Sequence, residues 1–176
     1  MMRPVRLGLL LPALFILAGP AASQDAVSAL KGHDSKAPVD VAADRIELQD
    51  RADRALLSGD VEIKQGDLTL RAPRVTVAYT RAGGTQIQRL DASGGVTVIS
   101  PSETARSQYA IYDFDRRLIT MLGGVSLSRT GSNVNGARLV IDLNTGRAAM
   151  DGSAVAGTSH AGGRVTGRFT VPDRNP

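Results

Sequence analysis

Apolar and polar residues alternate along most of the chain from Val39 onward. Val61 and Ile63 form one such pair, and Val75 and Val77 form another. Alternate residues of an extended chain point to the same face, so each such segment predicts a β-strand with one apolar face. The chain after the first two dozen residues lacks the 3.6-residue apolar period of a helix. The pattern predicts an all-β protein with roughly a dozen or more strands of about four to seven residues each.

Two short phrases recur within this pattern. The first centres on glycine and is found at residues 58–63 (SGDVEI), 93–98 (SGGVTV) and 122–127 (LGGVSL). It predicts a tight reversal that starts a strand. The second is found at residues 43–48 (ADRIEL) and 72–77 (APRVTV), with looser copies at 105–111 and 136–141. A repeated unit of two strands indicates stacked or meandering β structure.

The first residues have the layout of a secretory signal peptide. Arg3 and Arg6 precede an apolar stretch over residues 7–18, and small residues follow up to Ser23. The apolar stretch is shorter than the roughly 20 residues that span a bilayer, which disfavours the alternative of a retained anchor. We therefore expect residues 1–23 to be removed and the mature protein to be exported, most simply to a bacterial periplasm.

The rest of the chain divides into three parts. Residues 24–38 are polar and without period, which predicts a flexible leader. Residues 39–152 carry the alternating pattern and predict one β domain. Residues 153–176 form a tail rich in glycine and alanine, with one possible last edge strand over Val165–Val171.

Composition and charge exclude several classes of function. Cysteine is absent, so we expect no disulfide and no thiolate metal site. The formal net charge is +4 and aromatic residues are 3% of the chain, without the basic stripe and stacking rings typical of nucleic-acid binding. His33 and His160 lie in the leader and the tail, and Asp113 and Asp115 flank a predicted turn. We therefore expect no catalysis, no metal and no cofactor.

Several longer segments resemble the OstA-like family of lipopolysaccharide-transport proteins. The segments are residues 38–44 (PVDVAAD), 58–66 (SGDVEIKQG), 68–77 (LTLRAPRVTV), 122–125 (LGGV) and 132–138 (SNVNGAR). The resemblance covers about Val39–Gly152. It implies a twisted, slightly open antiparallel β-jellyroll whose apolar interior is a slot for acyl chains. It also implies a non-enzymatic periplasmic carrier that bridges the inner and outer membranes. The implied partners are lipopolysaccharide, an inner-membrane extraction complex, an outer-membrane OstA-type barrel protein and further copies of the chain, head to tail.

The candidate slot residues are the apolar positions expected on the inner faces of the strands. They are Val39, Val41, Ile46, Leu48, Val61, Ile63, Leu68, Leu70, Val75, Val77, Val96, Val98, Tyr109, Ile111, Val125, Leu127, Leu139 and Ile141. The alternative is that these residues only pack a sandwich core, which needs the same residue types.

The edges and the cations of the predicted fold give two further hypotheses. Unpaired backbone groups on an edge strand can add a strand from a partner, and Val39–Leu48, Ala148–Met150 and Val165–Val171 are the candidate edges. Lipid phosphates could meet cations at the rim of the slot. The candidate cations are Lys64, Arg71 and Arg74.

Two other functions fit an all-β repeat. One is a self-assembling structural β-solenoid of the cell envelope, although the repeated valines 61, 96 and 125 are unequally spaced, 35 and 29 positions apart. The other is a polysaccharide-active β enzyme, which would need a cluster of carboxylates or aromatic rings on one face. The sequence offers no such cluster.

Overall fold

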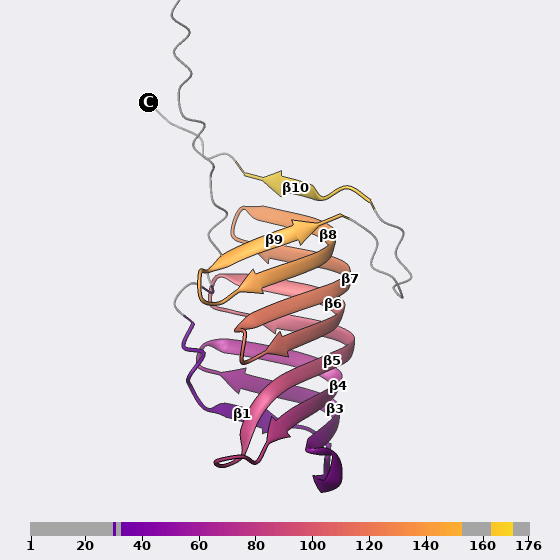
Figure 1. The fold of residues 1–176 in the computed structure, drawn as a ribbon. Helices are drawn as coiled ribbons and strands as arrows, with labels where there is room; N and C mark the ends of the chain where they lie inside the picture. Colours follow the sequence, from indigo (N-terminus) through magenta and orange to yellow (C-terminus); the bar gives the residue numbers. More distant parts are fainter. Residues whose placement is uncertain (1–29, 31–32, 153–162, 171–176) are drawn as a thin grey trace, which may run out of the picture.

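The computed structural model describes residues 30, 33–152 and 163–170 (Figure 1). The predicted signal peptide, residues 1–23, lies outside these residues. In the described part, no helix is both long enough and apolar enough to span a membrane.

Ten strands and one short 3-10 helix, η1 (Asp50–Ala52), make up the regular structure of the described residues. The strands are β1 (Val39–Ala42), β2 (Arg45–Gln49), β3 (Arg54–Gln65), β4 (Leu68–Thr80), β5 (Gln86–Ile99), β6 (Glu103–Asp113), β7 (Leu118–Arg129), β8 (Ser132–Asp142), β9 (Arg147–Asp151) and β10 (Thr166–Phe169). The all-β prediction is therefore confirmed. The predicted strand number and length are wrong, because β3 to β8 are each 11 to 14 residues long.

The six long strands form an antiparallel meander in chain order. At the N-terminal end, β1 pairs with the second half of β3 and β2 with its first half. At the C-terminal end, β9 pairs with the second half of β8 and β10 with its first half. Among the long strands, β3 to β8, neighbours in sequence are thus neighbours in the sheet. This differs from the predicted solenoid alternative, in which strands one coil apart would stack in parallel.

Each of β3, β5 and β7 bends in its middle, where the glycine phrase lies. The bend residues have positive φ angles between 37° and 97° and are the pairs Gly59–Asp60, Gly94–Gly95 and Gly123–Gly124. The pairing register shifts beside each pair, as it does at a β-bulge. The phrase was predicted to reverse the chain before a strand. Instead, it bends a strand in its middle, and hydrogen bonding to the neighbouring strands continues on both sides of the bend.

Because all bends lie side by side, the meander folds into two layers that join along the bends. On the side opposite the bends, called here the open side, each layer ends in hairpin turns. The hairpin at Gly66 and Asp67 belongs to one layer, and the hairpin between β6 and β7 belongs to the other. Figure 1 shows the strands stacked from β1 to β10 with a twist along the stack. The fold is the expected slightly open antiparallel β-jellyroll.

Candidate functional site

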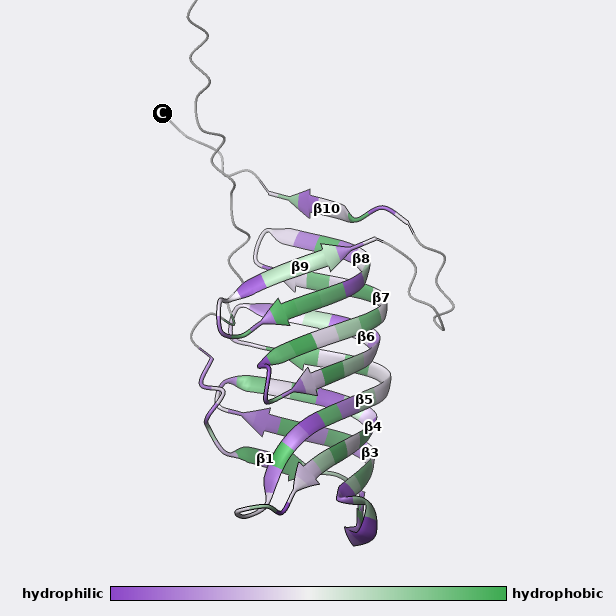
Figure 2. Ribbon diagram, in the orientation of Figure 1, coloured by the Kyte–Doolittle hydropathy of each residue, from purple (hydrophilic) through white to green (hydrophobic). Residues whose placement is uncertain are grey.

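The interior between the two layers, called here the slot, is filled by aliphatic side chains. The predicted slot residues that are buried in this shared core are Val61, Ile63, Leu68, Leu70, Val75, Val77, Val96, Val98, Val125, Leu127, Leu139 and Ile141. Figure 2 shows the alternation of hydrophobic and hydrophilic residues along the stacked strands. These residues face inward as predicted, and their contact with lipid stays a prediction.

The predicted residues of β1 and β2 also face the slot, but they are not fully covered. Val41 pairs with Ile63 and Ile46 pairs with Leu57, which places both on the inner face. Val41 is 42%, Ile46 48% and Leu48 69% exposed. Val39 is half-buried and packs against the core. No strand of the described residues lies beyond β1 and β2, so these side chains form an exposed apolar mouth at the N-terminal end of the slot.

The predictions for Tyr109 and Ile111 are wrong, because both face outward. Tyr109 is 48% exposed, and Ile111 pairs with Thr120 on the outer face. The register shift between Arg106 and Tyr109 places Gln108 and Tyr109, which are neighbours in sequence, both on the outer face. After them, the inward and outward positions of the strand are exchanged. Ala110 and Tyr112 are consequently the inward residues of this half of β6.

Several buried residues were not predicted from the sequence. They are Leu30, Leu57, Leu90, Tyr112, Ile119, Met121 and Leu143. Ile119 and Met121 lie in a continuous run of mostly apolar residues, where alternation gives no signal. Their partners in the register, Tyr112 and Ala110, show which face they share.

The C-terminal end of the slot contains an apolar cavity of about 270 Å³. Its lining comes from β7, β8, β9 and β10 and consists of Leu127, Arg129, Ser132, Val134, Leu139, Ala148, Met150 and Phe169. Phe169 is 69% exposed. This end therefore offers apolar surface and open volume together.

Two of the three predicted rim cations are engaged in ion pairs on the outer face. Lys64 Nζ lies 2.5 Å from Glu62 Oε1, and Arg71 donates to Glu62 Oε2 at 2.7 Å. Hydrogen bonds from Lys64, and next from Arg71, lower the pKa of the Glu62 carboxyl. Glu62 alternates with the inward Val61 and Ile63, so this cluster points away from the slot. Arg74, the third cation, faces outward as well.

A buried polar cluster bridges the two layers at the open side. Gln65 ends β3 in one layer, and Tyr112 lies near the end of β6 in the other. The Tyr112 hydroxyl donates to Gln65 Oε1 at 2.7 Å. Burial raises the pKa of Tyr112 to about 12, and the nearby charge of Arg117 acts in the opposite direction.

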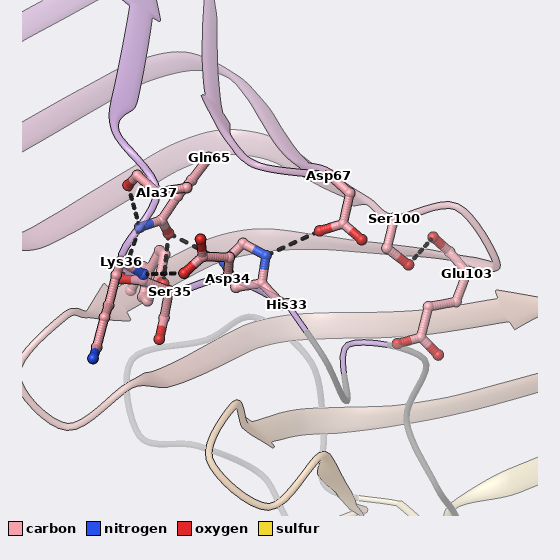
Figure 3. A network of polar contacts seen from close by, with 10 residues as sticks. His33, Asp34, Ser35, Lys36, Ala37, Gln65, Asp67, Ser100 and Glu103 are labelled. Atoms are coloured by element: carbon pink, nitrogen blue, oxygen red, sulfur yellow. Dashed lines mark hydrogen bonds and ion pairs between the residues drawn. The ribbon is translucent and has the colours of Figure 1, made fainter.

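His33 joins this cluster from the segment before β1 (Figure 3). Its Nε2 lies 3.2 Å from Gln65 Oε1, and its Nδ1 lies 3.1 Å from Asp67 Oδ1. Of the predicted flexible leader, residues 24–38, the described Leu30 and His33 are buried against the sheet, and residues 24–29, 31 and 32 lie outside the described residues. The short polar stretch gave no apolar period from which this packing could be expected.

The described residues contain no group of three or more histidine, cysteine, aspartate or glutamate side chains placed to hold a metal ion. The Asp113 side chain accepts a hydrogen bond from the backbone N–H of Arg116 at 2.9 Å, and Asp115 is exposed in the same turn. Asp113 therefore stabilises the turn, and Asp115 lies exposed within it. The site consists of apolar surface and volume, which suits the burial of hydrocarbon.

The fold and its interior place the protein in the class of open, two-layered antiparallel β-sheets that enclose an aliphatic slot. Residues 40–147 match the model of the family described as LptA/(LptD N-terminal domain) LPS transport protein. The chain belongs to this family. This confirms the resemblance found in the sequence.

Two individual proteins are also similar to the chain. An uncharacterized protein of Rhizobium meliloti (strain 1021), R00383, is 28% identical over 145 residues, which are 77% of this chain and 78% of that protein. The crystal structure of LptH from Pseudomonas aeruginosa superposes with a TM-score of 0.71 at 17% identity, covering 79% of this chain and 99% of that one. LptH is described as the LptA homologous periplasmic component of the lipopolysaccharide transport device. At this identity the likeness supports the fold.

Proposed function

We propose that the protein is a non-enzymatic periplasmic carrier that holds the acyl chains of lipopolysaccharide in the slot. The observation that carries the proposal is an aliphatic interior that is open at both ends. Val41, Ile46 and Leu48 are exposed at one end, and the apolar cavity beside Met150 lies at the other. Membership of the lipopolysaccharide-transport family supports the choice of lipid.

The energy of this binding comes from the removal of hydrocarbon from water. Each buried CH₂ group contributes about 0.8 kcal/mol, so an acyl chain of about a dozen carbons gains on the order of 10 kcal/mol before the costs of ordering and of parting the layers. A slot lined by valine, isoleucine and leucine provides this gain without directional contacts. The aliphatic side chains of the slot would also let the lipid slide along it.

We further propose that the two ends of the sheet join the protein to its partners. The outer edges of β1 and β2 at one end, and of β9 and β10 at the other, have no strand neighbour among the described residues. Strand addition at these edges would satisfy their backbone groups and make the apolar mouths continuous from one subunit to the next. The partners would be an inner-membrane extraction complex, an outer-membrane OstA-type barrel protein and further copies of the chain.

The proposal is tested by a charge placed on each face of one edge strand. Met150 of β9 faces the slot and packs against the core, whereas Ala149 is exposed on the outer face. We expect Met150→Asp to weaken binding of fluorescently labelled lipopolysaccharide at least tenfold, and Ala149→Asp to change it less than twofold. Circular dichroism confirms that both variants are folded. Equal binding by both folded variants would contradict the proposal.

A further inference from the structure

The segment before β1 lies along the open side of the slot. Its described residues Leu30 and His33–Ala37 are called here the N-terminal strap. Leu30 is 2% exposed and belongs to the same buried cluster as the inward side chains of both layers. The backbone N–H of His33 donates to the carbonyl of Leu30 at 3.1 Å, and the N–H of Ser35 to that of His33 at 3.0 Å. The strap therefore folds compactly and places one leucine inside the slot.

Gln65 fastens the strap to the wall of the slot. Its side chain is buried, with the whole residue 4% exposed, and its Nε2 donates to the backbone carbonyls of Ser35 at 3.0 Å and Ala37 at 3.1 Å. Its Oε1 accepts the hydroxyl of Tyr112 and lies beside the His33 ring. One amide thus connects the strap to both layers of the sheet. Figure 3 shows its contacts with the strap.

The strap resembles a segment that a ligand can displace from the slot more than it resembles a paired β-strand. Its described residues contribute one large apolar side chain to the buried cluster, and the backbone N–H groups of His33, Ser35 and Ala37 donate within the segment. The two strap carbonyls that Gln65 holds can bond to water after release. An acyl chain of about a dozen carbons buries several times more apolar surface than one leucine side chain, so it can replace the strap with a net gain.

We propose that the N-terminal strap occupies an acyl-binding subsite in the free protein and that the lipid displaces it on loading. The subsite is the space that Leu30 fills, and Gln65 is the residue that holds the strap there. This inference rests on the proposed function and deepens it, because it places a competitor for the lipid within the chain itself.

A reversible disulfide tests the proposal, since the chain has no native cysteine. A Cβ built on Gly66 lies 3.8 Å from the Cβ of Ala37, which matches the mean separation in disulfides, about 3.8 Å. The double variant Ala37→Cys with Gly66→Cys therefore fixes the C-terminal end of the strap to the turn between β3 and β4 when oxidised. We expect the oxidised form to bind labelled lipopolysaccharide at least tenfold more weakly than the same protein after reduction. Equal affinity of the two forms would overturn the proposal. Gly66→Cys alone is the control for strain at the positive φ of 55°.

A second pair of variants releases the strap without a disulfide. Leu30→Ser removes the side chain in the slot, and Lys36→Ser changes an exposed strap residue as the matched control. We expect Leu30→Ser to bind lipopolysaccharide several-fold more tightly and to raise the fluorescence of the apolar dye 1-anilinonaphthalene-8-sulfonate. Lys36→Ser should change neither. A folded Leu30→Ser protein with unchanged dye and lipid binding would refute the strap as a competitor.

Lipopolysaccharide binding and dye fluorescence together distinguish failure of the strap proposal from failure of the carrier function. If all variants bind lipopolysaccharide equally, the strap proposal fails and the carrier function stands. If none binds lipopolysaccharide, the carrier function fails, and with it the lipid as the displacing ligand. The dye then still reports whether Leu30 covers an apolar subsite.

Discussion

The paired positive φ angles at the bends predict how alanine substitutions will affect stability. A side chain with a Cβ costs about 1–2 kcal/mol in this region of φ. Gly95 has a φ of 97° and open space where a Cβ would stand, so Gly95→Ala should lower the free energy of unfolding by about 1–2 kcal/mol through backbone strain alone. Gly123 has a φ of 85°, and its added Cβ would lie 2.9 Å from the Cβ of Gln108. Gly123→Ala should therefore cost about 2–4 kcal/mol, since strain and overpacking add.

A substitution at Asp60 tests the same backbone strain in the opposite direction. It occupies the second position of the first bend with a φ of 37°, where aspartate is tolerated better than most residues. Asp60→Gly removes the strain but increases the conformational freedom of the unfolded chain, so we expect a change within about 1 kcal/mol.

Urea denaturation followed by circular dichroism measures all three variants. An unchanged dependence of the free energy on urea concentration would show that the same surface is exposed on unfolding. The bend account would be refuted if Gly95→Ala cost less than about 0.5 kcal/mol, or if Gly123→Ala were no worse than Gly95→Ala.

Two further predictions concern the core and the open side. Val77 is 6% exposed, so Val77→Asp should unfold the protein, whereas Val41→Asp, at an exposed mouth position, should leave its melting curve nearly unchanged; equal melting temperatures would contradict the burial of Val77. The folded pKa of Tyr112, about 12, is above the unfolded value of about 10, so its contribution to stability is complete below pH 10 and is lost between pH 10 and 12. Urea titrations across this range should show a smaller loss in Tyr112→Phe than in the wild type, and parallel losses would refute the assignment.

The sequence predicted the strand faces in most regular strand halves, but not in the second half of β6, where Tyr109 and Ile111 face outward. Val61 with Ile63, and Leu68 with Leu70, face the slot because alternation holds without interruption on one side of a bend. The sequence also placed the glycine phrase correctly but assigned it the wrong role. Glycine pairs permit either a hairpin turn or a bend within a strand, and only the hydrogen bonding of neighbouring strands decides between them.

Other features depend on tertiary contacts that no local pattern contains. The outward orientation of Tyr109 follows from the register shift between β6 and β7. The only sign of this shift in the sequence is the glycine pair of the adjacent strand, β7. Leu30 is buried in a cluster whose other residues are far from it along the chain. A single leucine in a polar stretch carries no periodicity, so its place in the slot was not predictable.

Photo-crosslinking at two neighbouring residues of β2 tests the carrier function most directly. Leu48 faces the slot and is 69% exposed, and Glu47 faces outward on the same strand. A photoreactive phenylalanine analogue at either position should therefore be tolerated by the fold. We predict that lipopolysaccharide crosslinks to the analogue at position 48 and not at position 47. Equal crosslinking at both positions, or crosslinking at position 47 alone, would contradict a lipid held within the slot.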